Sequence, residues 1–265
     1  TDTLSRNGYS ADMLSAVVGR GGLLPPVKSG AYEVNEEMAD VLMNRPVLEH
    51  ASNLGGLIAK DIADEAGIPA YIYDSVSVDE LSDVARITGL SEIVRTSQSH
   101  CLNMRAAAIK TAQEMGSAYT DMNLVVAHLG GGISLSAHRH GQMLDIVSDD
   151  EGPFSPERSG RLPIKNFIKL CAQHDINDIK KMVRGNGGLV SLLGTNSALE
   201  VQKRIDSGDE RARLVYEAMA YQIAKSIGEL AVVLDGEVDA IVITGGIAYS
   251  EFITEYIKKK VSFIA

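Results

Sequence analysis

The sequence contains no tryptophan, and aromatic residues make up only 5% of its 265 residues. The core must therefore be filled mainly by aliphatic side chains. Only two cysteines occur, Cys101 and Cys171, which are too few for a disulfide framework and lie at no metal-ligand spacing. We expect both to be buried free thiols in a reducing compartment, the cytoplasm.

Long hydrophobic runs and an excess of positive charge are also absent. No apolar stretch approaches the roughly 20 residues of a membrane-spanning helix. No basic, apolar segment with small residues opens the sequence, so we expect no secretory signal. Lysine and arginine total 25 against 35 aspartates and glutamates, for a net charge of −10. The sequence thus predicts no membrane and no nucleic-acid partner, and any anionic ligand requires a local, enclosed group of cations.

What is present indicates an α/β fold. Hydrophobic residues make up 45% of the chain, and short apolar runs alternate with amphipathic segments. The spacing predicts strands over 70–74, 124–129, 238–244 and 261–265. It predicts helices over 53–66, 102–115, 164–171, 176–183, 209–234 and 250–260.

The most informative feature is a run of three glycines, Gly130, Gly131 and Gly132, after the apolar strand 124–129. Apolar and polar residues then alternate with a period of two over 133–138, so the glycines join one strand to the next. A second turn leads into a third strand, which completes an antiparallel meander.

A glycine bend of this kind exposes backbone N–H groups and lets a phosphate approach closely. A plain tight hairpin is the alternative. The segment is not a Walker loop, because no Lys-Ser/Thr pair follows it. It is not a dinucleotide fingerprint either, because a strand follows where a helix is required, and this disfavours a nicotinamide dehydrogenase.

Three further loops combine glycine or arginine with the end of a predicted element. Gly245 and Gly246 join a buried strand to a helix, a common place for a nucleotide. Arg158 lies on the loop 151–160, which two prolines stiffen, and a guanidinium suits a carboxylate or a phosphate. Arg20 follows an apolar run and is flanked by glycines. Simple packing or a structural turn explains each of these loops about equally well.

The histidines allow two interpretations. His128 lies inside an apolar strand, either as a core residue or as a ligand-binding residue. His50 and His100 come just before helix starts, where they can donate a hydrogen bond to an anion. His138 and His140 lie near the tip of the predicted hairpin, where we expect both to be solvated.

Seven segments together resemble the butyrate kinase branch of the acetate kinase family. They lie between Val17 and Ala265 and read VVGRGGLLPPVKSGAY, EHASNLGGLIA, LVVAHLGGGISLSAHRHG, EGPFSPERSG, GNGGLVSLLGTN, EAMAYQIAKSIG and VDAIVITGGIAYS. Agreement over so many segments is not expected by chance.

The resemblance implies an α/β protein of two ribonuclease-H-like lobes, the actin-like ATPase fold that sugar kinases and heat-shock chaperones share. Residues 1–76 would form a partial first lobe and residues 77–265 the second, nucleotide-binding lobe. The family's first phosphate hairpin, Asn-x-Gly-Ser-x-Ser-x-Lys, and its acidic final segment are absent from the sequence. We therefore expect an internal piece of a longer protein, with its first lobe incomplete.

The resemblance also implies a reaction, the reversible transfer of a phosphoryl group from ATP to butyrate, with Mg²⁺, giving butanoyl phosphate and ADP. The catalytic positions would be Arg20, Arg158, Asp74, His100 and His50, with Asp74 also the candidate Mg²⁺ ligand. The nucleotide-binding positions would be His128, Gly130, Gly131, Gly132, Ser134, Asn196, Gly245, Gly246 and Ile247. A homo-oligomer is implied as well.

Two alternatives stay open. The first is that this protein is a branched-chain fatty acid kinase or an acetate kinase. Thr96 stands where acetate kinases carry a further histidine, and this departure favours the butyrate branch over acetate kinase. The second alternative is a non-catalytic, actin-like nucleotide-binding scaffold. The arginine-bearing loop 151–160 argues against it.

Overall fold

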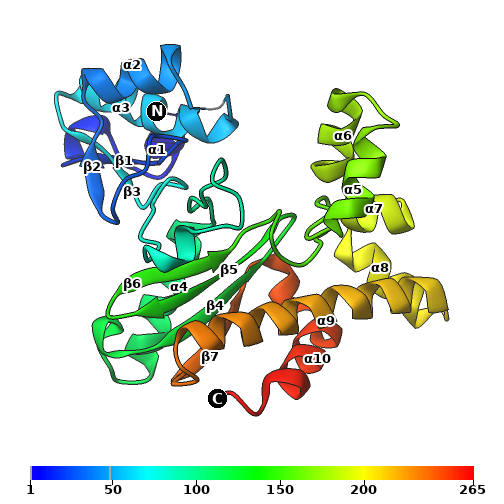
Figure 1. Cartoon of the computed structure of the whole chain (residues 1–265). Coiled ribbons are helices and arrows are strands. Elements are labelled where there is room, and N and C mark those ends of the chain that lie inside the picture. Colours follow the sequence, from blue (N-terminus) through cyan, green and yellow to red (C-terminus); the bar gives the residue numbers. More distant parts are fainter. Residues whose placement is uncertain (1, 48) are drawn as a thin grey trace. The chain divides into compact units, whose positions relative to one another are not determined.

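The computed structural model describes residues 2–47 and 49–265. The chain divides into two compact units (Figure 1). The first comprises the residues up to Glu80 together with Thr88–Leu102, and the second comprises Leu81–Ile87 and Asn103–Ala265. The lobe boundary expected after residue 76 stays a prediction. Across the described ranges, no helix is both long and apolar enough to cross a membrane.

The first unit is built on a small mixed sheet of order β1-β3-β2. β1 (Val17–Arg20) runs parallel to β3 (Ala70–Tyr73), and β2 (Ala31–Glu33) runs antiparallel to β3. α3 (Leu54–Ala66) packs on β1 and β3, and α2 (Glu36–Asn44) packs on α3. The unit also contains α1 (Asp2–Arg6) and the 3₁₀ turns η1 (Ala11–Met13) and η2 (Ala51–Asn53).

Two glycines let α3 approach β1 closely. A Cβ atom on Gly19 would overlap the carbonyl oxygen of Gly55, and a Cβ atom on Gly55 would overlap the carbonyl oxygen of Arg20. Gly19, which precedes Arg20, therefore serves helix packing, and Arg20 itself lies exposed at the end of β1. Gly67, with a φ of 66°, ends α3 in the left-handed conformation.

The second unit is built on a sheet of order β6-β5-β4-β7. β4 (Leu124–Leu129), β5 (Ile133–Arg139) and β6 (Gln142–Val147) form the predicted antiparallel meander, and β7 (Ala240–Thr244) runs parallel to β4. The remaining elements are η3 (Val84–Arg86), α4 (Cys101–Glu114, in this unit from Asn103 on), η4 (Tyr119–Asp121), α5 (Ile164–Cys171), α6 (Ile176–Val183), α7 (Gly188–Leu193), α8 (Ala198–Asp206), α9 (Glu210–Val233), η5 (Gly246–Tyr249) and α10 (Glu251–Val261).

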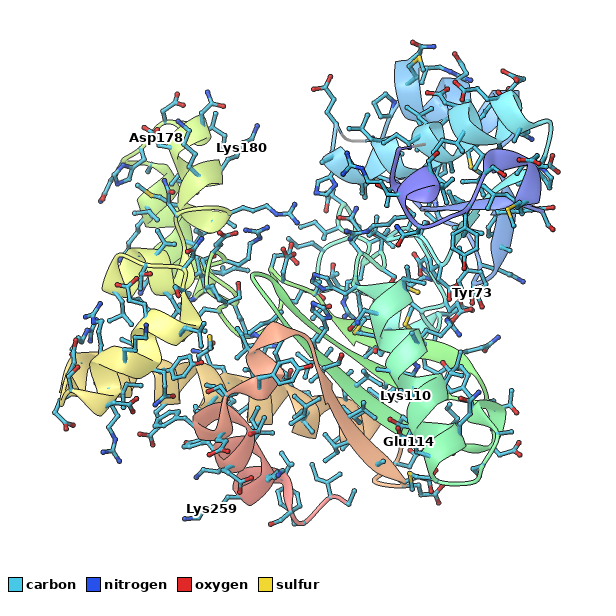
Figure 2. The ribbon with its side chains drawn as sticks, turned by 180° about the vertical axis from the view of Figure 1, so that it is seen from behind. Tyr73, Lys110, Glu114, Asp178, Lys180 and Lys259 are labelled. Atoms are coloured by element: carbon cyan, nitrogen blue, oxygen red, sulfur yellow. The ribbon has the colours of Figure 1, made fainter. Side chains whose placement is uncertain are left out.

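Different helices cover the two faces of this sheet. Side chains alternate along β4, so Val125 and Leu129 point to the face that α9 covers with buried residues such as Tyr216. The alternate residues Leu124, Val126 and His128 point to the other face, which the helix α4 covers (Figure 2). There the Met104 sulfur accepts a hydrogen bond from the Ser136 hydroxyl at 3.4 Å.

The strand predicted over 261–265 is wrong. α10 continues to Val261, and a turn follows. The reason is visible in the spacing of the buried residues, because Ile253, Ile257 and Val261 recur every four residues and form one buried stripe on α10.

The prediction of a solvated His138 is also wrong, whereas His140 is exposed as expected. His138 is fully buried, with Nδ1 2.7 Å from the Tyr119 hydroxyl and Nε2 2.6 Å from the Ser136 hydroxyl. Burial, and next the positive charge of Arg105, lowers the pKa of His138 from 6.5 to about 3. The imidazole is therefore neutral and structural. Both cysteines are free, with Cys101 buried and Cys171 half-buried.

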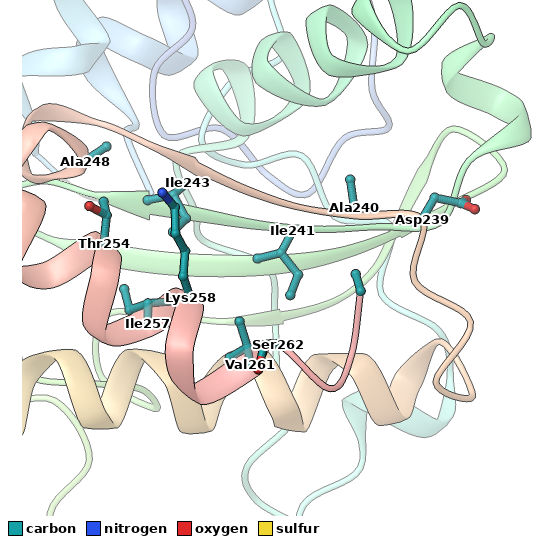
Figure 3. A pocket seen from close by; sticks show the side chains of 11 residues that line it. Asp239, Ala240, Ile241, Ile243, Ala248, Thr254, Ile257, Lys258, Val261 and Ser262 are labelled. Atoms are coloured by element: carbon teal, nitrogen blue, oxygen red, sulfur yellow. The ribbon is translucent and has the colours of Figure 1, made fainter.

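A hollow of about 740 Å³ lies between β7 and α10 (Figure 3). Its walls are largely aliphatic and include Ile241, Ile243, Ile257 and Val261, and Lys258 also lines it. Among the described residues that line it, none belongs to the predicted nucleotide site.

Candidate active site

Two glycine loops meet at one edge of the sheet in the second unit. The carboxyl ends of β4 and β7 are neighbours because the strands run parallel and in register. The bend from Gly130 to Gly132 follows β4, and Gly245 follows β7. A Cβ atom on Gly245 would overlap the carbonyl oxygen of Leu129, so Gly245 lies against the last residue of β4, directly before the bend. This edge is where open α/β sheets bind their ligands.

The loop after β7 leaves its backbone accessible. The turn η5 begins at Gly246, and a Cβ atom on Gly246 would meet nothing within 4 Å. Ile247 is 6% exposed and packs into the core. Ile247 can therefore contact a ligand only through its backbone.

The proline-stiffened loop 151–160 supports the triple-glycine bend. The Ser155 hydroxyl donates to the Gly131 carbonyl at 2.6 Å, and the Glu157 backbone N–H donates to the same oxygen at 3.4 Å. The loop is itself held by Gly188, whose φ is 59° and whose Cβ atom would overlap the Ser155 carbonyl oxygen. The glycine segment 185–188 is thus part of the support of the site.

Arg158 projects from the same loop and shares a carboxylate with a second arginine. Its Nε lies 3.1 Å from Asp149 Oδ2, and the same oxygen lies 3.1 Å from an Arg184 terminal nitrogen. Glu157 Oε2 lies 3.6 Å from Arg158 Nη1, and Glu157 Oε1 accepts a hydrogen bond from Asn196 Nδ2 at 2.7 Å. Arg158, Asn196 and the bend are therefore linked through Glu157.

His128 and Ser134 flank the bend on its two strands. His128 is half-buried, with Nδ1 2.7 Å from the carboxamide oxygen of Asn103 on α4. Ser134 is 2% exposed, and its hydroxyl lies 3.8 Å from the Met104 sulfur. The Ser134 side chain is thus turned toward α4.

In the first unit, Arg20 and Asp74 end adjacent parallel strands. Arg20 is in register with Tyr73, so Asp74 follows at the same edge of that sheet. Asp74 is 3% exposed and has a φ of 41°, and its Oδ1 accepts hydrogen bonds from the Ser29 hydroxyl at 2.8 Å and the Gly30 backbone N–H at 3.0 Å. These bonds hold the carboxylate in one orientation.

The two other predicted catalytic histidines also belong to the first unit. His50 is exposed and caps η2, where its Nδ1 accepts from the Ser52 backbone N–H at 3.1 Å. His100 is half-buried and immediately precedes α4.

The second unit gathers most of the predicted nucleotide-binding residues at one sheet edge, whereas Arg20, Asp74, His50 and His100 are carried by the first unit. Sequence reasoning missed four residues of the second unit's site, namely Asn103, Asp149, Glu157 and Arg184. Two of them had a local signal, because Glu157 precedes Arg158 and Arg184 precedes the glycine segment 185–188. The other two are recognisable only from contacts between distant segments.

Asp74 is the predicted Mg²⁺ ligand, and its surroundings can be compared with the ligands that Mg²⁺ prefers. Within the described ranges, no group of three or more His, Cys, Asp or Glu side chains is arranged to hold a metal ion. Mg²⁺ is usually held by one or two carboxylates together with substrate phosphates. A single, firmly oriented carboxylate such as Asp74 fits that ligand set.

Solved structures share this fold. The structure superposes on acetate kinase of Porphyromonas gingivalis with a TM-score of 0.83 at 22% identity, covering 96% of this chain and 68% of that one. Acetate kinase of Entamoeba histolytica gives a TM-score of 0.81 at 17% identity, covering 99% and 70%. At such identities the likeness establishes the fold alone, and it confirms the predicted α/β, actin-like ATPase fold.

Relatives identified by sequence have a higher identity to this chain than these two solved structures. Butyrate kinase 2 of Clostridium acetobutylicum is 48% identical over 99% of this chain and 75% of its own length. The probable butyrate kinase 2 of Caldanaerobacter subterraneus is 50% identical, with the same coverages of 99% and 75%. The model of the acetokinase family matches residues 90–264. The chain therefore belongs to the acetokinase family.

Proposed function

We propose that this protein transfers the γ-phosphoryl group of ATP to the carboxylate of butyrate, reversibly, giving butanoyl phosphate and ADP. Family membership and 48–50% identity to butyrate kinases support an ATP-dependent carboxylate kinase. Within the structure, the observation that carries the proposal is the close approach of Gly245 to Leu129, the residue directly before the Gly130–Gly132 bend, together with the support that the Arg158-bearing loop gives to this bend.

The chemistry requires little covalent help from the protein. A carboxylate oxygen of butyrate attacks the γ-phosphorus, and the bond from that phosphorus to the β–γ bridging oxygen breaks, which leaves ADP. No proton has to be removed, because the carboxylate is already the nucleophile. The protein must hold two anions in line and neutralise the charge on the transferred group.

The residues divide this work as follows in our proposal. The backbone N–H groups of Gly130, Gly131 and Gly132 bind nucleotide phosphates, and Arg158 contacts the transferred phosphoryl group. Ser134 and Ile247 contribute through their backbones, because their side chains are buried. Asn196 and the 245–246 loop face the nucleoside.

The first unit supplies the remaining groups. Arg20 contacts the carboxylate or the phosphoryl group, and His50 and His100 donate hydrogen bonds to these anions. Asp74 is the proposed protein ligand of Mg²⁺. When bound, Mg²⁺ would neutralise negative charge on the phosphates.

The test is acyl phosphate formation. The full-length protein is incubated with ATP, Mg²⁺ and a carboxylate, and the product is trapped as its hydroxamate. We expect butyrate to be used more efficiently than acetate by at least roughly 10²-fold, because acetate lacks two methylenes and each contributes about 1–3 kcal/mol. ATP binding without hydroxamate from any acid would instead support the non-catalytic scaffold.

We also propose that the protein is cytoplasmic and a homo-oligomer. α9 offers a candidate contact, because Leu214, Tyr221 and Val232 on this helix are exposed. Light scattering of the purified chain tests the oligomer, and a monomer at micromolar concentration would contradict it.

A further inference from the structure

The ring of His128 is anchored from the neighbouring helix. His128 stands two residues before the triple-glycine bend, and its Nδ1 lies 2.7 Å from Oδ1 of Asn103 in the first turns of α4. A carboxamide oxygen accepts hydrogen bonds and does not donate them. The hydrogen in this bond therefore belongs to Nδ1 of His128.

The second ring nitrogen lies beside the bend. Nε2 of His128 is 3.0 Å from the position that a Cβ atom on Gly130 would take. With the hydrogen of the neutral ring held on Nδ1, Nε2 is an acceptor in the neutral form and a donor only in the imidazolium form. A phosphate oxygen needs a donor.

We propose that Asn103 is a positioning residue for His128: it holds the ring in its Nδ1–H form with Nε2 at the bend, so that only the imidazolium donates to a nucleotide phosphate. The identity of that phosphate rests on the proposed function. The tautomer and orientation of the ring rest on the hydrogen bond alone.

Polar and charged groups of the second unit surround His128. The strand neighbours in register are Ser134 on β5 and Thr244 on β7, and neither hydroxyl titrates near neutral pH. The charged residues of the supporting loop are Glu151, Glu157 and Arg158, and Glu157 Oε2 lies 3.8 Å from the position of a Cβ atom on Gly131. Arg105 of α4 is directed elsewhere and donates to the Gly141 carbonyl at 2.6 Å.

The experiment measures the tautomer of the His128 ring directly. Long-range ¹H–¹⁵N spectra of the full chain give the tautomer of each histidine, and a His128→Gln variant assigns the signals. In the wild type we expect the neutral His128 ring to carry its hydrogen on Nδ1. In Asn103→Ala we expect the tautomer equilibrium to shift toward Nε2–H, the form that imidazole side chains favour in water. Gln113→Ala, an exposed amide on the same helix, is the matched control and leaves the tautomer unchanged.

Asn103→Asp is the second variant. A carboxylate at this place keeps the acceptor for Nδ1–H and adds a negative charge, so the titration midpoint of His128 moves up by about one pH unit or more. Nε2–H in the wild-type neutral ring, or a tautomer and midpoint that neither variant changes, overturns the proposal.

A binding measurement connects the tautomer to the ligand. In the wild type, ATP affinity falls by up to about tenfold per pH unit above the His128 midpoint, because the neutral ring no longer donates. In Asn103→Ala the neutral ring donates from Nε2, so this dependence flattens, whereas a merely structural defect would weaken binding equally at every pH. If the tautomer is as expected but the wild type forms no acyl phosphate, the proposed function fails and the positioning role stands.

Discussion

Arg158 does not lie free on its loop but is oriented by a carboxylate. Asp149 Oδ2 is 3.1 Å from Arg158 Nε and 3.1 Å from Arg184. A guanidinium has five N–H donors in a rigid fork, so a bond at Nε fixes the plane in which its terminal nitrogens can meet an anion. The side chain is only 21% exposed, which limits competition from water.

Arg158→Ala tests this residue. We expect kcat for butanoyl hydroxamate formation to fall by roughly 10²–10⁴-fold, because a cation on the transferred phosphoryl group contributes about 3–5 kcal/mol at the transition state. Arg45→Ala, which removes an exposed arginine paired with Asp40, is the control and leaves kcat unchanged. More than about a tenth of the wild-type kcat in Arg158→Ala would contradict the role.

His138 makes stability depend on pH. Its pKa is lowered from 6.5 to about 3 in the folded state, mainly by burial, so between these values the unfolded chain binds more protons. The contribution is complete above the unfolded pKa and is lost as the pH falls. We expect the free energy of unfolding in urea to drop by up to about 1.4 kcal/mol per pH unit below about pH 6.5 from this group.

The comparison that isolates His138 is His138→Gln against His140→Gln, an exposed neighbour. Between about pH 7.5 and about pH 5, His138→Gln removes the contribution of His138 to the pH dependence of the free energy of unfolding, whereas His140→Gln leaves this contribution in place. An unchanged slope in His138→Gln would show that its burial does not govern the acid response.

At the scale of elements, glycines determine how closely strands and helices approach. Gly19 and Gly55 bring α3 against β1, and Gly245 brings the loop after β7 against Leu129. The sequence shows that glycines cluster at these places, but packing and ligand contact predict the same clusters. Packing and ligand contact are distinguished only by the atoms that a Cβ atom at each glycine would meet in the structure.

Adjacent glycines in one loop provide a matched test. Gly245 has φ 90° and ψ 173°, a region almost restricted to glycine, and its Cβ atom would overlap the Leu129 carbonyl oxygen. We expect Gly245→Ala to lower the free energy of unfolding by about 1–3 kcal/mol and to weaken ATP binding. At Gly246 the space is open, so Gly246→Ala should change stability by less than about 0.5 kcal/mol. Equal losses in both variants would refute this account.

For the whole molecule, a net charge of −10 means that anion binding depends on local groups. Ligand that binds only the folded chain stabilises it, by about 2.7 kcal/mol at one hundred times the Kd. We expect ADP to raise the melting temperature accordingly. NAD at the same concentration should produce no shift, and a shift with NAD alone would revive the dehydrogenase that the strand after the glycines disfavours.

The prediction of helices and strands succeeded where the local sequence pattern is compatible with only one kind of element. The apolar run of β4 is bounded by glycine and was predicted at its observed residues, Leu124–Leu129, and the apolar spacing of α5 was also sufficient. It failed at 261–265, because a short apolar stretch suits a strand or the last turn of a helix. The alternation of β5 was recognised, but the burial of His138 depends on Tyr119 and α4, which lie far away in the sequence.

The sequence by itself determined the α/β class, the glycine meander and the resemblance to the acetate kinase family, because periodicity, turn residues and motifs are local properties of the chain. The tertiary structure alone decided which groups act together. Asn103 meets His128 across 25 positions of sequence, and Asn196 meets Glu157 across 39. Such contacts arise only when packing of the core brings the ends of distant elements to one sheet edge, and no local pattern encodes them.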